Sequence, residues 1–410
     1  MLDRASWILR AGLILSVLIS VAQAETKTIR FSDLDNHAQE YSPRAQIIGQ
    51  EFERVLAERD EDLQWSNPVI AYDREDVDQA KEYQITIGKQ VEVPWAYSKK
   101  RSSWKDRVKS AELTKEQSRR THLATLKSGY VALQLLDEYL SRLERFKEAL
   151  SDASHVATSR HSEGHLSGAE EHLIQMAIIS LNASHQSALQ ERKELSAFWR
   201  ANVGLGPDDV VTLATPVGFG LIDLKPVEHY TAVVESQPDY MSRSLLVESF
   251  RKRASAEKGK FIPALNVYAG LKKIDPDVDG YVAGVSLSLP LFNRNGSTAR
   301  KYRIESDIAR TEMQLNRTQA IGQVQALTES IAGSQGSLAL ASPHFLEDSE
   351  EFNNLLYSYE EGWLTLNELL NAIQIEVAGL EHYYGQLTQF YLNLFQLETI
   401  TGETLVNFEE

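Results

Sequence analysis

The stretch Tyr281–Gly296, with the sequence YVAGVSLSLPLFNRNG, decides how the rest of the chain is interpreted. In its first eleven residues, apolar side chains alternate with mostly small or polar ones; the apolar set is Tyr281, Ala283, Val285, Leu287, Leu289 and Leu291. A period of two predicts a β-strand with one apolar face and one small or polar face. The run is about ten residues long, which is the length that a tilted strand needs to cross a bilayer.

Three other segments share this alternation and complete two predicted hairpins, at about residues 65–95 and 261–291. Aromatic residues lie at the strand ends, where a transmembrane barrel carries its interfacial girdles; they are Trp65, Tyr83, Trp95, Phe261, Tyr281 and Phe292. A soluble sheet packed on a core would give the same alternation, and this alternative stays open. Four strands cannot close a membrane barrel, because the smallest ones use about eight. A chain that spans the membrane in this way is therefore predicted to form oligomers.

The two hairpins belong to an internal repeat that covers the mature chain. Gly88 recurs as Gly284, 196 positions later, and Gly164 recurs as Gly362, 198 positions later. We expect a first repeat at residues 25–205, a linker at 206–235 and a second repeat at 236–410. Each repeat is predicted to contain a helix, a β-hairpin and a long helical hairpin, whose tips lie near residues 164 and 362.

The predicted helices are longer than those of an ordinary globular domain. Between Ser98 and about His161 only Gly129 interrupts a helical pattern, so about 60 residues would extend ~90 Å. In the last helix, apolar residues follow the alternating three- and four-residue spacing of a coiled-coil seam; they are Trp363, Leu366, Leu370, Ile373, Val377, Leu380, Tyr384, Leu387, Tyr391 and Leu394. Pro343 is expected to break or kink the helix that precedes this seam.

The first 24 residues have the features of a signal peptide. Arg4 and Arg10 precede an apolar run at residues 11–22, and Ala22-Gln23-Ala24 gives a small-x-small cleavage pattern. The run is shorter than the ~20 residues of a membrane-spanning helix, although an uncleaved anchor is the alternative. We predict export, with cleavage before Glu25.

Composition excludes several classes of protein. The chain has 42 Lys and Arg against 58 Asp and Glu, and the resulting formal charge of -16 disfavours nucleic-acid binding. It has no cysteine, and therefore no disulfide, thiolate metal site or lipidated cysteine. No Walker loop, G-x-S-x-G or HExxH pattern occurs. We therefore assign no catalytic residue, metal site or cofactor, and expect that the protein is not an enzyme.

A histidine pair and an acidic segment both resemble parts of metal sites, but the residues around each argue against metal binding. His161 and His165 have the spacing of two ligands on one helical face, but Gly164 lies between them at the predicted turn. Solvated surface histidines are the favoured interpretation. The segment Asp275–Gly280 begins like an EF-hand loop, but the twelfth position is Ser286 rather than a bidentate Glu. An acidic hairpin tip that faces the medium is favoured there.

The chain resembles the TolC-type outer-membrane efflux proteins. The motifs that carry the resemblance are Gly284-x-x-Leu287-x-Leu289-Pro290-Leu291-Phe292-Asn293-Arg294-Asn295-Gly296, Tyr359-x-x-Gly362 with Leu364-Thr365, Gln237-Pro238-Asp239, and Pro343. They cover essentially the whole mature chain, which looks most similar to the heavy-metal cation efflux branch. The first hairpin departs from the pattern, because Pro94-Trp95-Ala96 replaces Pro-Leu-Phe.

The resemblance implies a fold class and a function. The fold would be mainly α with transmembrane β-structure: a homotrimer whose 12-stranded outer-membrane β-barrel is continued by a periplasmic α-helical barrel. Outer-membrane lipid would surround the strands, and the partners would be a periplasmic adaptor and an inner-membrane pump. The trimer would be the passive exit duct of this tripartite efflux system, so that the pump rather than the duct selects the cargo. The alternatives are a periplasmic coiled-coil adaptor or a structural protein without a membrane barrel, neither of which would depend on detergent.

The resemblance also implies where the duct is narrow. In the family, acidic residues six and nine positions after the tip glycine ring the pore. These positions hold Glu368 and Asn371 here, and Glu170 holds the first equivalent place in the other repeat. Three Glu368 carboxylates around one axis would raise the local concentration of cations.

Both helical tips are predicted to dock the adaptor. Glycine allows the chain to reverse with a positive φ, and the following leucine would offer an exposed apolar contact to a partner's helical hairpin. The residues of the two predicted docking tips are Gly164, Leu166, Ser167, Gly362, Leu364 and Thr365.

Overall fold

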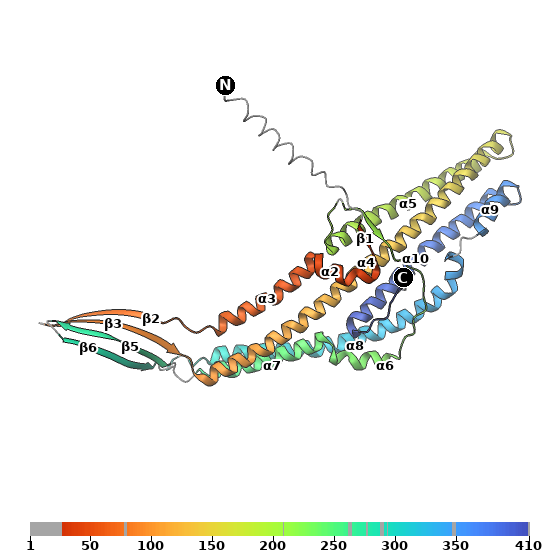
Figure 1. Ribbon diagram of the computed structural model, residues 1–410. Coiled ribbons are helices and arrows are strands. Elements are labelled where there is room, and N and C mark those ends of the chain that lie inside the picture. Colours follow the sequence, from red (N-terminus) through yellow and green to blue (C-terminus); the bar gives the residue numbers. More distant parts are fainter. Residues whose placement is uncertain are drawn as a thin grey trace, which may run out of the picture.

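A four-stranded sheet lies at one end of a long body of helices, and two helical tips lie at the other end (Figure 1). The computed structural model describes residues 27–410 except 78–79, 208, 261–264, 276–277, 288–290, 293, 347–349 and 409–410. The predicted signal peptide lies outside the described residues. The same is true of Phe261, of Asp277, and of Leu289, Pro290 and Asn293 in the motif after the last strand.

The elements follow one another as two similar halves. The first half comprises β1 (Lys27–Ile29), η1 (Phe31–Asp33), α2 (Leu34–Tyr41), α3 (Pro43–Leu63), β2 (Val69–Val77), β3 (Ala80–Val91), α4 (Pro94–Ser162) and α5 (Gly168–Val203). The second half comprises β4 (Val211–Leu213), α6 (Val227–Val233), η2 (Val234–Ser236), α7 (Pro238–Gly259), β5 (Leu265–Asp275), β6 (Val278–Leu287), α8 (Gly296–Leu346), α9 (Glu350–Glu360) and α10 (Leu366–Thr401).

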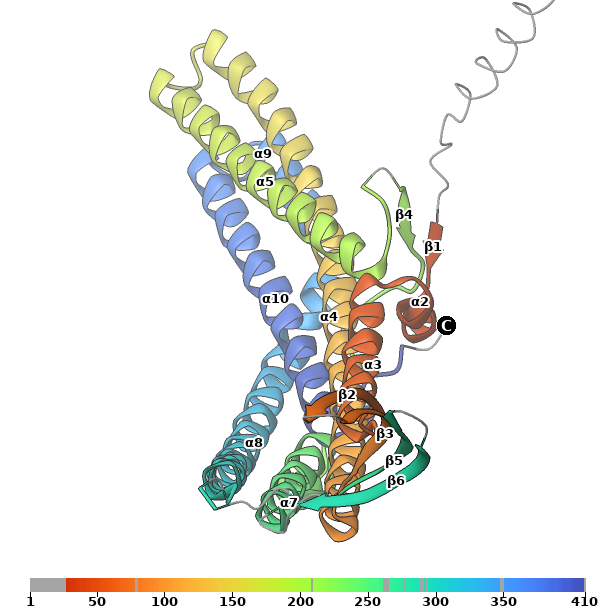
Figure 2. The ribbon, with the colours of Figure 1, turned by 90° about the vertical axis from the view of Figure 1, so that its left-hand side faces the viewer.

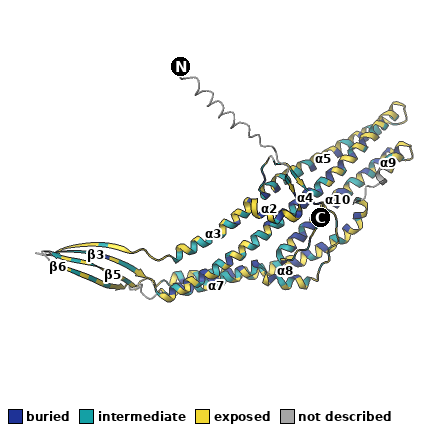
Figure 3. Cartoon of the chain, viewed as in Figure 1, coloured by how far each residue is buried: buried dark blue, intermediate teal, exposed yellow. Residues whose placement is uncertain are grey.

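The sheet has the order β2-β3-β5-β6, and all its neighbours are antiparallel. The register brings the alternating apolar residues onto one common face, because directly paired residues point to the same side. These residues are Ile70, Tyr72, Ile85, Ile87, Leu265, Val267, Ala269, Leu271, Tyr281, Ala283, Val285 and Leu287. The apolar face is open to its surroundings: Ile70 is 74% exposed and Tyr281 is 92% exposed (Figure 3). Strands β2 and β6 are its two unpaired edges.

The opposite face of the sheet explains two of the repeated glycines. Tyr268 pairs with Gly88 on one neighbouring strand and with Gly284 on the other. A Cβ atom at Gly284 would lie 2.2 Å from the Tyr268 hydroxyl oxygen, and one at Gly88 would lie 3.1 Å from the Tyr268 Cβ. The tyrosine ring therefore occupies space that only glycine leaves free at position 284, whereas at Gly88 the tight contact is with the tyrosine Cβ.

Below the sheet, the helices form a row in the order α3-α4-α7-α8 (Figure 2). Helix α4 has 69 residues, which corresponds to about 100 Å. Small side chains let α4 and α7 approach closely: the Ser110 hydroxyl donates to the Ser242 carbonyl at 2.7 Å, and the Ser249 hydroxyl donates to the Ser103 carbonyl at 2.9 Å. The outer helices of the row are α3 and α8.

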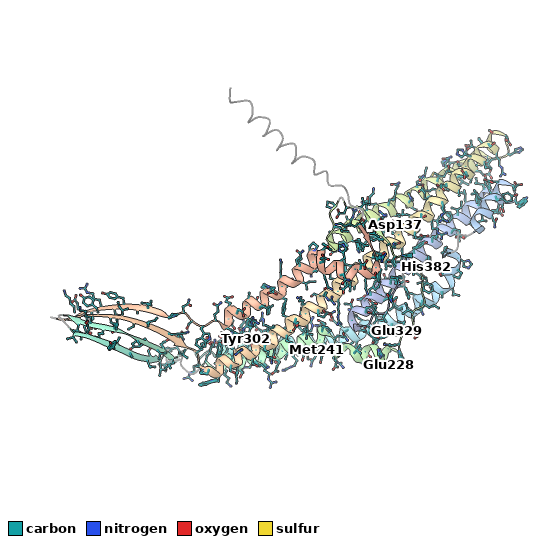
Figure 4. All side chains as sticks on the ribbon, in the orientation of Figure 1. Asp137, Glu228, Met241, Tyr302, Glu329 and His382 are labelled. Atoms are coloured by element: carbon teal, nitrogen blue, oxygen red, sulfur yellow. The ribbon has the colours of Figure 1, made fainter. Side chains whose placement is uncertain are left out.

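A charge network fixes three of these helices just below the strands. Asp62 at the end of α3 accepts hydrogen bonds from Trp104 Nε1 at 2.6 Å and from Arg253, and lies 3.2 Å from Lys100 Nζ. Burial by itself would raise the pKa of Asp62, but the hydrogen bonds from Arg253 and Trp104 outweigh it and hold the pKa well below its usual range. Arg253 also lies 5.4 Å from the ring of Tyr302 on α8, which Figure 4 labels near the start of that helix.

The coiled-coil seam of α10 packs against α4 and α8. Most of the predicted seam residues are buried or half-buried, from Leu366 at 2% exposed to Leu394 at 0%. Trp363 is the exception: it is 73% exposed and precedes the helix, so its assignment to the seam was wrong. Pro343 lies in the last turn of α8, which ends at Leu346.

A second, smaller sheet was missed. Strands β1 and β4 pair in parallel, so the described part of the chain holds six strands rather than the four that the sequence indicated. Three residues per strand are too few to display a period of two. Tyr130 of α4 joins this sheet to the helical core: its hydroxyl donates to the Thr215 carbonyl at 3.2 Å and accepts from the Thr215 N–H at 2.8 Å. Among the described residues, no helix is long and apolar enough to cross a membrane.

Candidate functional site at the helical tips

The two tips have the same backbone conformation. Gly164 and Gly362 have φ values of +77° and +82°, in the left-handed region that glycine adopts without strain. The N–H of Leu166 donates to the Arg160 carbonyl at 3.2 Å, and the N–H of Leu364 donates to the Ser358 carbonyl at 3.1 Å. The turns of the two repeats therefore form equivalent backbone hydrogen bonds.

The carboxylates expected at the pore are helix caps. Glu368 accepts hydrogen bonds from the Thr365 N–H at 2.8 Å and from the Thr365 hydroxyl at 2.7 Å, and its own N–H donates to that hydroxyl at 3.3 Å. Glu170 makes the same capping box with Ser167. The S/T-x-x-E pattern of a capping box occurs in both repeats of the sequence and could have predicted these caps.

The caps keep both glutamates charged. The backbone N–H of Thr365 and then its hydroxyl lower the pKa of Glu368. The pKa of Glu170 is lowered by the same two groups of Ser167. Each side chain binds the cap through its Oε2 atom and is exposed to solvent, so a negative charge persists at the start of α5 and α10 at neutral pH.

Arg160 connects the two tips and was not found from the sequence. Its Nη2 atom donates to the Glu360 carbonyl at 2.8 Å, and its guanidinium lies 5.0 Å from the ring of Tyr359. Tyr359 is 1% exposed, and burial raises its pKa. The last turn of α4 is thereby attached to the last turn of α9, which gives the two hairpins one common end.

The predicted exposed leucines are only partly exposed. Leu166 and Leu364 are half-buried and pack against the helical core, so their description as exposed apolar contacts was wrong. Burial against the core of neighbouring helices removes their apolar surface from water, which favours the inward position. Trp363 is an exposed apolar side chain at the second tip, and its ring meets that of Tyr357, which is also exposed, edge-on at 5.8 Å.

Asn371 lies three residues after Glu368 on α10 and lines a groove. The groove runs between α5 and α10 and has a volume of about 450 Å³. Its lining includes Leu173 and Met176 from α5 and Leu370 and Asn371 from α10. Leu173 and Met176 are 45% and 49% exposed, so an apolar strip remains open beside the second tip.

The histidines at the first tip form local contacts. His161 Nδ1 lies 2.9 Å from the Leu166 carbonyl, and His161 Nε2 lies 3.7 Å from a Glu171 carboxylate oxygen. Within the described ranges, no group of three or more His, Cys, Asp or Glu residues is arranged to hold a metal ion.

Comparisons with known proteins relate this geometry to a known fold. Over 334 residues, the chain is 24% identical to the cobalt-zinc-cadmium resistance protein CzcC of Cupriavidus metallidurans, covering 76% of each chain. The outer membrane protein VceC of Vibrio cholerae superposes with a TM-score of 0.73 at 12% identity, covering 92% of this chain and 97% of VceC. The outer membrane channel CmeC of Campylobacter jejuni gives a TM-score of 0.72 at 12% identity, covering 93% and 87%. No family model matches the chain.

This is the TolC-type outer-membrane channel fold. The predicted resemblance and the mainly α fold with a few strands are confirmed, whereas the predicted trimer stays a prediction. In this chain the sheet lies at one end of the helical body and the paired tips lie at the other (Figure 1). The match covers 92% of the chain for VceC and 93% for CmeC.

Proposed function

We propose that the chain is the outer-membrane exit duct of a tripartite efflux system, open to the periplasm through its helical tips. It conducts its cargo passively and has no catalytic residues. The observation that carries the proposal is the sheet with one predominantly apolar, exposed face at the end of a TolC-type helical wall. A periplasmic adaptor or a structural coiled-coil protein has no need for such a face.

The duct requires more than one copy of the chain. Strands β2 and β6 leave both edges of the sheet unpaired, and unpaired backbone groups are not tolerated in lipid. Three copies supply the 12 strands that the TolC-type resemblance implies. The helical row has matching edges, since α3 precedes β2 and α8 follows β6.

The two helical edges have opposite charge. Helix α3 contains six acidic and three basic residues, whereas residues 296–317 of α8 contain five basic and three acidic residues. The exposed Glu61 on α3 and the exposed Arg303 on α8 lie at similar heights, because the intervening contacts run from Asp62 through Trp104 and across α7 to Tyr302. We assign these two residues to facing positions in neighbouring copies.

The absence of native cysteine makes this assignment directly testable. A chain with Glu61→Cys and Arg303→Cys should form dimers and trimers, and no larger species, when membranes are oxidised. The pair Lys105→Cys and Arg303→Cys is the control, because Lys105 lies on α4 in the interior of the row. Only monomers from the first pair, or recovery of the wild-type protein in the soluble periplasmic fraction, would contradict the proposal.

The tips are the proposed entrance and docking site. Glu368 and the equivalent Glu170 place negative charge at the entrance, and Asn371 lies on the adjoining groove. Adaptor contacts are assigned to the turns at Gly164 and Gly362 with Leu166, Ser167, Leu364 and Thr365, and to the exposed Trp363. An inner-membrane pump completes the system. In adaptor pull-down, Trp363→Ala should weaken binding, whereas Tyr357→Phe should not.

The similarity to CzcC supports divalent metal cations of the cobalt, zinc and cadmium class as cargo. A deletion strain should become sensitive to these metals and recover with the wild-type gene. Sensitivity confined to organic compounds would reject metals as cargo without affecting the duct itself.

A further inference from the structure

The helices next to the sheet carry an unusual concentration of positive charge. Residues 94–109 and 251–260 together contain eleven Lys and Arg and only two acidic residues, in a chain whose formal charge is -16. These segments are the start of α4 and the end of α7, which lie side by side where the helical row meets the strands (Figures 1 and 2). The charge is therefore local and not a property of the whole surface.

Some of these cations pair with Asp62, whereas others are exposed on different faces of the same helices. Lys100 on α4 and Arg253 on α7 both turn toward Asp62. Arg101 and Lys105 lie four residues apart on another face of α4, and Arg251 and Lys258 lie seven apart on another face of α7. All four are exposed. We name them the basic collar.

The collar cations are not neutralised by the chain itself. Among the described residues, Arg101, Lys105 and Lys258 have no ion pair, and Arg251 has only an exposed contact of 3.7 Å with Glu248 on its own helix. Exposed pairs of that kind contribute little. Because α4 and α7 are the two inner helices of the row, the edge-to-edge closure between copies leaves their faces uncovered.

Between the apolar strands and the collar lies an aromatic zone. Lys89 Nζ lies 4.5 Å from the ring of Trp65, and the exposed Trp95 begins α4. Arg101 is seven residues beyond Pro94, or ~10 Å along the helix, and Lys258 is one residue from the end of α7. The sequence of apolar, aromatic and cationic zones matches the hydrocarbon, interface and headgroup levels of one leaflet.

We propose that the basic collar binds the anionic headgroups of phospholipids in the leaflet on the helical side of the strands. The inference rests on the proposed outer-membrane duct and specifies which lipid class surrounds its base. The partner is a phospholipid with a net negative headgroup, such as phosphatidylglycerol. Each Lys or Arg close to an anionic membrane surface contributes roughly 1 kcal/mol, or about fivefold in affinity.

The test measures lipid preference around the assembled protein. The purified oligomer is reconstituted into vesicles, and quenching of its tryptophan fluorescence by brominated lipids gives the binding constant of phosphatidylglycerol relative to phosphatidylcholine. We expect a preference of at least about fivefold for phosphatidylglycerol, reduced toward one by 0.5 M salt or by Arg101→Gln with Lys105→Gln. The matched control, Arg44→Gln with Lys193→Gln, removes the same charge from exposed sites outside the collar and should keep the preference.

The experiment distinguishes failure of the collar proposal from failure of the proposed duct. Equal affinity for the two lipids in an inserted wild-type protein would overturn the collar and leave the duct intact. A change in the cation-to-anion permeability ratio in the α4 variant, with unchanged lipid preference, would place these cations in the lumen and also overturn it. Absence of quenching by either brominated lipid would mean that the strands do not enter the bilayer, and the proposed duct would fail together with the collar.

Discussion

Gly204 and Gly402 end α5 and α10 in the same way, but a side chain would meet different neighbours at the two sites. Their φ values are +92° and +75°, and each N–H donates to the carbonyl four residues earlier, in Arg200 and Glu398. A Cβ at Gly204 would lie 2.1 Å from the Tyr41 carbonyl oxygen. A Cβ at Gly402 would instead meet side-chain ends, with its closest atom 2.7 Å away.

Both alanine substitutions therefore strain the backbone, but only the one at Gly204 also forces the new methyl group against a neighbouring backbone. Alanine in the left-handed conformation costs about 1–2 kcal/mol at either site. At Gly204 the added atom also meets backbone that cannot rotate away, and overpacking of this kind costs about 1–3 kcal/mol more. At Gly402 the ends of Arg120 and Gln237 can move aside. We expect Gly204→Ala to destabilise the protein more than Gly402→Ala by about 1–3 kcal/mol.

The comparison uses unfolding rates, because many large proteins unfold irreversibly. Purified protein in detergent is held at one elevated temperature, and the loss of helix is followed by circular dichroism. If the extra strain is relieved in the transition state for unfolding, Gly204→Ala should unfold about 5- to 150-fold faster than Gly402→Ala. Equal rates, or the reverse order, would refute the reasoning from the Tyr41 backbone contact.

Three other changes probe the tips and the sheet. Glu368→Ala should reduce the block of single-channel current by multivalent cations applied from the periplasmic side. The pKa of Glu368 is lowered in the folded protein, so its stabilising contribution is present above the unfolded-state pKa and is lost as pH falls through the folded-state pKa. Protonation in that pH range also removes the carboxylate charge, so acid should reduce the block as well. An unchanged block in the variant would place the constriction elsewhere. Arg160→Ala should accelerate amide hydrogen exchange at residues 357–362 while Arg160→Lys does so less, and equal protection in all three proteins would mean that the link between the tips is dispensable. Gly284→Ala should lower the yield of folded oligomer and Tyr268→Leu should restore it, because the added methyl group would occupy the space of the tyrosine ring; a double variant no better than Gly284→Ala alone would exclude this contact as the cause.

The sheet was the part most accessible from the sequence, because period two and strand length are local properties. The register that brings Ile85 opposite Leu271, and the apolar face that results, follow from alternation once the two hairpins pair. The reason for the repeated glycines could not be read in this way. Gly284 is required by the ring of Tyr268, and Gly88 is tightly packed against the Cβ of the same residue; this neighbour on the strand between them is defined only by tertiary pairing.

At the tips, the sequence located the turns but not the contacts between them. Gly164 and Gly362 could be recognised as reversals because glycine adopts a positive φ. Arg160 could not be recognised, because its partner in the other hairpin is 200 residues away and is a backbone carbonyl that any residue provides. The exposure of Leu166 was misjudged for a related reason: burial depends on which helix lies beside the turn.

The order of strands and the order of helices coincide, and this coincidence explains how one kind of contact would close the proposed duct. Helix α3 leads into β2, β3 leads into α4, α7 leads into β5, and β6 leads into α8. Every strand of the sheet β2-β3-β5-β6 therefore has its own helix in the row α3-α4-α7-α8. The free edges of the two layers lie on the same flanks of the chain, so one rotation that pairs β6 with β2 of the next copy also brings α8 against its α3. A substitution that repels α3 from α8 should consequently prevent closure of the barrel as well, although it lies outside the strands.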